Sequence, residues 1–234
     1  MRQTPQFPPL FNGEKVPKHT DPFDKAVSRA VAGIDSGTIF YSEDSDTLRA
    51  ALVLAPETPL EESIQAVYVA QIGLAESLGA LAPPEVPVHF EWPDRIKVNG
   101  AVCGRVRYAA ETMDPSQIPN WLVIGIEVAF IPETDDPGAN PHQTCLYEEG
   151  CGEIEPMALL ESWSKHTLLW LTHFMDSGFD RIHNEWRPRC DSLGKEVEAP
   201  MEGLFVGLDE KGRMLLRQGV MTETLSLINY AEHQ

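Results

Sequence analysis

The stretch that decides the fold reads Glu91-Trp92-Pro93-Asp94-Arg95-Ile96-Lys97-Val98-Asn99-Gly100-Ala101-Val102-Cys103-Gly104. An Asn-Gly pair between β-forming residues predicts a hairpin with a two-residue type I′ turn. A turn of that length fixes the pairing of the strands that flank it. Val98 is therefore expected opposite Ala101, and Lys97 opposite Val102.

The same register places Ile96 opposite Cys103 and Arg95 opposite Gly104. Directly opposed side chains lie on one face of a sheet, so one face of the hairpin is apolar and the other carries Arg95 and Lys97. A glycine in a strand often marks the close approach of another group. Two cations beside Gly104 could hold a carboxylate or a phosphate. The alternative is that both are ordinary solvated strand residues.

Outward from the hairpin, hydrophobic periodicity and turn residues divide the rest of the chain into helices and strands. Apolar residues at helical spacing, capped by Asp21-Pro22 and by Thr58-Pro59-Leu60-Glu61, predict two helices before the hairpin. Helices are expected at 21–33, 58–78, 156–177 and 179–190. Strands are expected at 37–41, 48–55, 86–92 and 121–131, the two strands of the hairpin at 96–108, and three further strands between 202 and 227.

The chain is expected to form one main domain with two small appendages. Residues 1–20 are rich in proline and predict an extended arm. Residues 21–198 alternate helices and strands and predict an α+β body. Residues 199–234 contain only short strand patterns around the turn at 209–212, which predicts a small antiparallel β module.

The composition limits the kinds of partner and the cellular location that are expected. The chain has 36 acidic and 18 basic residues, a formal net charge of −18, and no long Lys/Arg run. Nucleic acids and anionic membranes are therefore poor partners. A cytoplasmic location is expected, because no signal peptide or membrane-spanning run is evident. The four cysteines form no CxxC pair, so no metal site is expected.

The Trp-Pro and Asn-Gly hairpin resembles the biotin protein ligases, within the biotin/lipoate A/B protein ligase family. That family typically reads Lys-Trp-Pro-Asn-Asp, a short apolar strand, Asn-Gly-Lys-Lys and then glycines. Residues 122–128 resemble its Gly-Ile-Gly-Ile-Asn strand, residues 159–186 its paired helices, and residues 202–227 its SH3-like module. The resemblance implies a mixed β-sheet backed by helices, with a small C-terminal β module.

The resemblance also implies an activity. Such enzymes join biotin, lipoate or octanoate to AMP, using ATP, and pass the acyl group from the acyl-adenylate to a lysine of a biotinyl or lipoyl carrier domain. The ligand-binding residues that it implies here are Trp92, Pro93, Asp94, Arg95, Val102, Gly104 and Gly125, with Trp92 shaping the pocket.

Four elements of that adenylation site are altered in this sequence. The Gly-Arg-rich loop should lie at 42–47, but those residues are Ser-Glu-Asp-Ser-Asp-Thr, and acids there repel phosphate. Glu91 stands for the lysine before Trp-Pro, Ala129 for the strand asparagine, and Val102 for the active-site lysine. We expect Lys97, the cross-strand neighbour of Val102, to supply the missing ammonium as a catalytic lysine.

Three functions remain open at this point. The first is a divergent ligase that binds a small carboxylic acid and transfers it to a carrier lysine. The second is a non-catalytic protein that binds a small acid or an acyl-carrier domain on the same scaffold. The third is an acyltransferase with a cysteine nucleophile, for which Cys145, three residues after His142, is the candidate.

Overall fold

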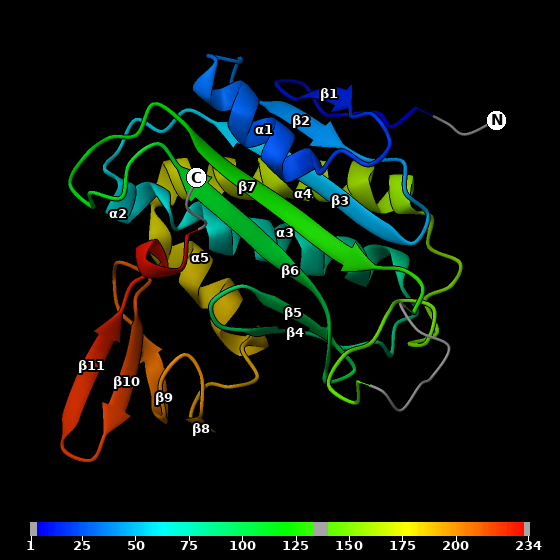
Figure 1. The fold of residues 1–234 in the computed structure, drawn as a ribbon. Coiled ribbons are helices and arrows are strands. Elements are labelled where there is room, and N and C mark those ends of the chain that lie inside the picture. Colours follow the sequence, from blue (N-terminus) through cyan, green and yellow to red (C-terminus); the bar gives the residue numbers. More distant parts are fainter. Residues whose placement is uncertain (1–3, 133–139, 232–234) are drawn as a thin grey trace.

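A computed structural model describes residues 4–132 and 140–231. A seven-stranded sheet crosses the molecule, with two long helices on one face and one short helix on the other (Figure 1). A separate four-stranded antiparallel sheet follows near the C-terminus. The chain therefore has the α+β fold expected of it, a mixed sheet backed by helices plus a small β module.

The large sheet has the strand order β1-β2-β3-β7-β6-β5-β4. β1 runs parallel to β2, and every other neighbouring pair is antiparallel. Its strands are β1 (Asn12–Lys15), β2 (Thr38–Tyr41), β3 (Thr47–Leu54), β4 (Val88–Glu91), β5 (Arg95–Val98), β6 (Ala101–Ala110) and β7 (Leu122–Ala129).

The small sheet has the order β11-β10-β9-β8. Its strands are β8 (Glu196–Val197), β9 (Gly203–Leu208), β10 (Met214–Gln218) and β11 (Met221–Leu225). The helices are α1 (Pro22–Val31), α2 (Leu60–Ser63), α3 (Ala66–Leu81), α4 (Pro156–Ser177) and α5 (Phe179–Trp186), and the 3₁₀ turns are η1 (Arg187–Arg189) and η2 (Leu227–Tyr230).

Most elements lie where the sequence predicts them, and the differences have local causes. The arm contains the strand β1. All four of its residues are exposed and none is a large apolar residue, so no apolar pattern predicts this strand. The expected helix at 58–78 is divided into α2 and α3. The expected helix at 179–190 ends at Trp186 and continues as the turn η1, which contains Pro188.

The main core lies between the sheet and the layer formed by α3 and α4. Twelve of the sixteen residues of α3 are buried, so this helix is apolar on nearly every side. The stretch Leu60–Leu81 is long and apolar enough to cross a membrane by composition: its 18-residue window has a mean hydropathy of 1.3, but 78% of that window is buried inside the fold. We interpret it as the central core helix.

A second, smaller core lies under α1 on the opposite face. Asp21 caps this helix by accepting a hydrogen bond from the main-chain N–H of Phe23 at 2.7 Å, and Pro22 occupies the first turn. Phe23 and Val27 pack onto the sheet beside β3 and β7. Because α1 is only ten residues long, part of this face of the sheet is left for polar side chains (Figure 1).

Candidate functional site

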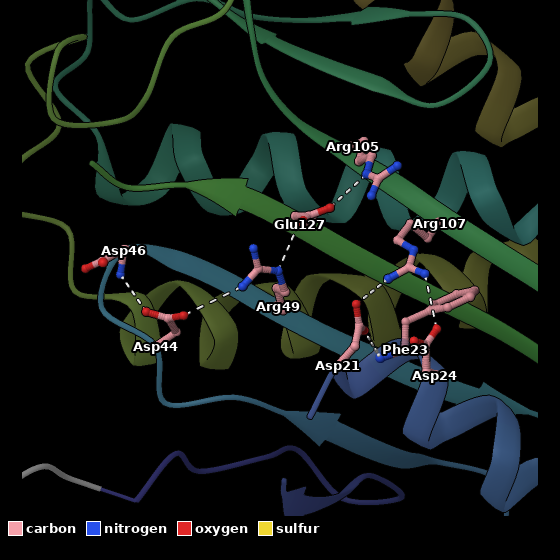
Figure 2. Close-up of polar contacts among 9 residues, drawn as sticks. All are labelled: Asp21, Phe23, Asp24, Asp44, Asp46, Arg49, Arg105, Arg107 and Glu127. Atoms are coloured by element: carbon pink, nitrogen blue, oxygen red, sulfur yellow. Dashed lines mark hydrogen bonds and ion pairs between the residues drawn. The ribbon is translucent and has the colours of Figure 1, made fainter. Parts of the chain in front are cut away.

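A row of charged side chains crosses the face of the sheet that carries α1. Arg49 of β3 pairs in register with Glu127 of β7, and Glu127 pairs in register with Arg105 of β6. The Nε of Arg49 donates to one oxygen of Glu127 at 2.8 Å, and the Nε of Arg105 donates to the other at 2.7 Å. Figure 2 shows this carboxylate held between the two guanidinium groups.

The two arginines determine the charge state of Glu127. Burial alone would raise the pKa of its carboxyl, but the hydrogen bonds from Arg105 and Arg49 outweigh that effect and lower the pKa. Glu127 is therefore ionised at neutral pH. A strand of otherwise apolar residues thus presents one fixed negative charge to this face of the sheet.

A cavity of about 590 Å³ lies beside this row of charges. Its volume is within the range of small-molecule sites. Strands β3, β5, β6 and β7 form one side, and the segment that follows residue 139 forms the other. The lining residues are Thr47, Arg49, Asp94, Arg95, Val102, Cys103, Gly104, Arg105, Glu127, Ala129, Ile131, Pro132, Asn140, His142, Gln143, Thr144, Cys145 and Glu148.

The wall after residue 139 is fixed to the hairpin by main-chain hydrogen bonds. The N–H of Val102 donates to the carbonyl of His142 at 2.9 Å, and the N–H of Thr144 donates to the carbonyl of Val102 at 2.9 Å. The Asn99 amide at the tip of the hairpin donates to Glu149 at 2.6 Å. The turn predicted from Asn-Gly therefore holds one wall of the cavity.

Four of the predicted ligand-binding residues line the cavity together, namely Asp94, Arg95, Val102 and Gly104. Asp94 lies directly before β5 and is half-buried, whereas Arg95 is exposed. Burial raises the pKa of its carboxyl despite the nearby charges of Arg95 and Arg105, which act in the opposite direction.

The predicted register is correct next to the turn and wrong beyond it. Val98 pairs with Ala101 and Lys97 with Val102, but the register then shifts, so that Ile96 faces Gly104 and Arg95 faces Arg105. Cys103 is the extra residue of a β-bulge. Gly104 is required because a Cβ there would collide with the main-chain oxygen of Glu127.

Trp92 and Pro93 lie away from the cavity, contrary to the expectation that Trp92 shapes it. Trp92 is 4% exposed, its Nε1 donates to the Tyr68 hydroxyl at 2.9 Å, and its ring packs edge-on against Tyr230. The carbonyl of Pro93 accepts a hydrogen bond from Gln71 at 3.1 Å. These two residues connect the large sheet to α3 and to the C-terminal module.

Gly125 has a packing role between α1 and β7. A Cβ at this position would lie 2.7 Å from the ring of Phe23, so glycine lets α1 approach β7. Arg107 holds the same helix, since its guanidinium lies 4.2 Å from the centre of the Phe23 ring and donates to Asp21 at 2.7 Å (Figure 2). The expectation that Gly125 contacts a ligand does not fit this position.

Lys97 does not occupy the place beside Val102 that the sequence predicts for its ammonium. The Nζ lies 2.7 Å from Asp191 and 3.4 Å from Glu91, and the side chain is 16% exposed. Asp191 lies at the outer edge of the sheet, where its N–H donates to the carbonyl of Phe90. Burial would lower the pKa of Lys97, but its two carboxylate partners raise it above the ordinary value.

The acidic segment at 42–47 forms a short connection between β2 and β3. The carboxylate of Asp44 lies 3.6 Å from Arg49, and it also accepts the N–H of Asp46 at 3.1 Å (Figure 2). One acid of this segment thus neutralises part of the charge of Arg49 near the cavity.

The cysteines have the environment of structural thiols. All four are buried and free, and burial raises the pKa of Cys103, Cys145, Cys151 and Cys190. A nucleophilic cysteine requires a lowered pKa. Cys145 lines the cavity, but its thiol is protonated at neutral pH, which disfavours a thiol acyltransferase.

Arg49, Arg105 and Glu127 are site residues that the sequence analysis did not identify, because they come from three different strands. A signal was present in the sequence. Each is a charged residue inside a largely apolar strand, which indicates a polar patch on a buried sheet. Within residues 4–132 and 140–231, no group of His, Cys, Asp and Glu side chains could hold a metal ion.

The family model of the biotin/lipoate A/B protein ligase family matches residues 7–188. The chain belongs to this family. It is 43% identical to a biotin protein ligase-like protein of unknown function from Silicibacter sp. TM1040, over 98% of this chain and 100% of that one, with a TM-score of 0.93. A biotin–[acetyl-CoA-carboxylase] ligase of Paracoccus denitrificans is 26% identical over 173 residues, which cover 71% of this chain and 72% of that one.

The fold is shared more widely in the family. The biotin protein ligase of Aquifex aeolicus in complex with biotin and ATP is 18% identical over 92% of this chain and 95% of that one, with a TM-score of 0.72. At that identity the likeness concerns the fold alone.

Proposed function

We propose that this protein binds a small carboxylic acid of the biotin, lipoate or octanoate type in the cavity beside Arg49, Glu127 and Arg105. The observation that carries the proposal is the position of this 590 Å³ cavity on the Asn-Gly hairpin of a biotin ligase fold. The Aquifex aeolicus relative was solved with biotin and ATP, which supports this class of ligand.

The site has few groups for stabilising an adenylate. Phosphoryl chemistry needs fixed positive groups at the phosphorus. Here Val102, which the resemblance matches to the family's active-site lysine, lines the cavity, and Lys97 is engaged by Asp191 and Glu91. Of the arginines that line the cavity, Arg49 and Arg105 share Glu127, and Arg95 pairs with Glu91. Acid binding with weak or absent activation therefore fits the site better than full ligase activity.

Calorimetry with the full chain and biotin, lipoate or octanoate tests this proposal. One of these acids should bind, and Mg-ATP should leave its affinity unchanged within about twofold. Mass spectrometry should detect no acyl-AMP. Formation of acyl-AMP, followed by transfer to a biotinyl or lipoyl carrier domain, would instead establish a ligase. Failure of all three acids to bind would refute the proposal.

A Lys97→Gln variant distinguishes a structural role of Lys97 at the sheet edge from the catalytic role expected from the sequence. Because its ammonium is held at the sheet edge, acid binding should stay within about twofold of the parent protein. The free energy of unfolding should fall by about 1 to 3 kcal/mol, since Asp191 loses its partner in a partly buried position. A large loss of binding without a loss of stability would support the catalytic role instead.

A further inference from the structure

Two arginines face each other directly across the hairpin at the edge of the cavity. Arg95 of β5 and Arg105 of β6 are paired in register, and both line the cavity. Their side chains are 55% and 50% exposed. Like charges directly opposite each other on antiparallel strands are destabilising, so this pair requires an explanation.

The carboxylates already present engage each arginine on one side. The Nη1 of Arg95 lies 3.0 Å from Glu91, and the Nε of Arg105 lies 2.7 Å from Glu127. Both carboxylates are shared with another cation, Glu91 with Lys97 and Glu127 with Arg49. A guanidinium group carries five N–H donors in a planar fork, so each arginine retains donors for a further oxyanion.

The bulge in the hairpin creates this pair. In a regular two-residue hairpin Arg95 would face Gly104, but the extra residue Cys103 moves Arg105 into that position. Bulges commonly re-aim side chains next to functional sites. Burial raises the pKa of the neighbouring Asp94 carboxyl, although the charges of Arg95 and Arg105 act in the opposite direction.

We propose that Arg95 and Arg105 act as a clamp for the oxyanion group of the cavity ligand, a carboxylate or a phosphate. The inference rests on the proposed function in that it takes this cavity as the ligand site. It adds the atoms that hold the charged end of the ligand. The apolar part of the ligand then extends past Val102, toward the wall that follows residue 139.

The test is calorimetry of the full chain with two probes, biotin for the carboxylate and AMP for the phosphate. Arg95→Gln and Arg105→Gln should each lower the affinity for the probe that binds by at least tenfold. Arg217→Gln is the matched control, because Arg217 is an exposed strand arginine of β10 in the other sheet. That control should leave both affinities unchanged.

Thermal unfolding of the same variants separates a clamp from a structural role. Arg95→Gln removes one member of a like-charge pair, so its midpoint should stay constant or rise. Unchanged affinity in both variants, or a loss of affinity matched by a lower midpoint in Arg95→Gln, would overturn the clamp.

The two proposals can fail separately. Biotin binding that both variants retain would refute the clamp and leave the proposed function. AMP binding through the arginines, with no acid bound, would keep the clamp and refute the proposed function. Binding of neither probe by the parent protein would refute the clamp along with biotin as the ligand.

Discussion

Asp94 lies in the wall of the cavity with its carboxyl largely buried, and this burial raises its pKa above the ordinary value. A raised pKa in the folded state means that ionisation opposes folding. The stability that the neutral form retains at low pH is lost as the pH rises through the folded pKa. Replacing Asp94 with asparagine removes this loss and preserves the shape of the side chain.

We therefore expect Asp94→Asn to be more stable than the parent protein at pH 7. The difference should disappear as the pH falls below the unfolded pKa of aspartate, about 3.9. Urea unfolding between pH 3.5 and pH 8 measures it, with Asp35→Asn at an exposed position as the control. A parent protein that gains stability relative to Asp94→Asn with rising pH would contradict the expected sign.

At the scale of elements, helix α3 is joined to the C-terminal module through one buried hydroxyl. The hydroxyl of Tyr68 donates to the carbonyl of Gly212 at 2.5 Å and accepts from Trp92 at 2.9 Å. Gly212 lies in the turn before β10, and Trp92 in the connection between β4 and β5. Three segments far apart in the sequence therefore depend on a single oxygen atom.

Tyr68→Phe should lower the free energy of unfolding by about 2 to 4 kcal/mol, because it leaves a buried N–H and a buried carbonyl without a partner. Chemical denaturation measures this change. Tyr147→Phe is the control, since Tyr147 is 66% exposed and its hydroxyl is accessible to water. A loss no larger than that of the control would mean that water replaces the missing hydroxyl.

The hairpin shows how far the sequence predicts an element. Asn99-Gly100 and the alternation around it correctly predict the strands, the turn and the first two residue pairs. The bulge at Cys103 is not predictable from this pattern, because alternation alone cannot count an extra residue in one strand. It depends on the close approach of Gly104 to β7, which is a tertiary contact.

In the candidate site, too, the sequence predicts what neighbouring residues determine but not what tertiary contacts determine. The residues contributed by the hairpin are next to each other in the sequence, so the pattern identifies Asp94, Arg95, Val102 and Gly104. The sequence places Trp92 and Lys97 at the ligand site because the hairpin sequence does not reveal the positions of Tyr68 and Asp191. Each of those partners comes from a distant segment and redirects the side chain.

For the whole molecule, the two sheets share one continuous core. Phe205 of β9 and Leu216 of β10 belong to the same buried cluster as α3 and the large sheet. Lys211 also forms an ion pair with Glu61 at 2.6 Å across the junction. We therefore expect one cooperative transition in scanning calorimetry, with equal calorimetric and van't Hoff enthalpies. Two separate transitions would show that the C-terminal module folds independently.

A pair of glycine substitutions tests the same coupling. Gly212 and Gly219 both have positive φ, at 71° and 60°, so alanine strains the backbone at either position. Only at Gly212 would a Cβ meet the main domain, 2.8 Å from the Tyr68 ring, whereas nothing lies within 4 Å at Gly219. Gly212→Ala should therefore lower the single melting midpoint by about 2 to 10 °C more than Gly219→Ala, since overpacking costs about 1 to 3 kcal/mol. Equal shifts would mean that the module tolerates displacement from α3.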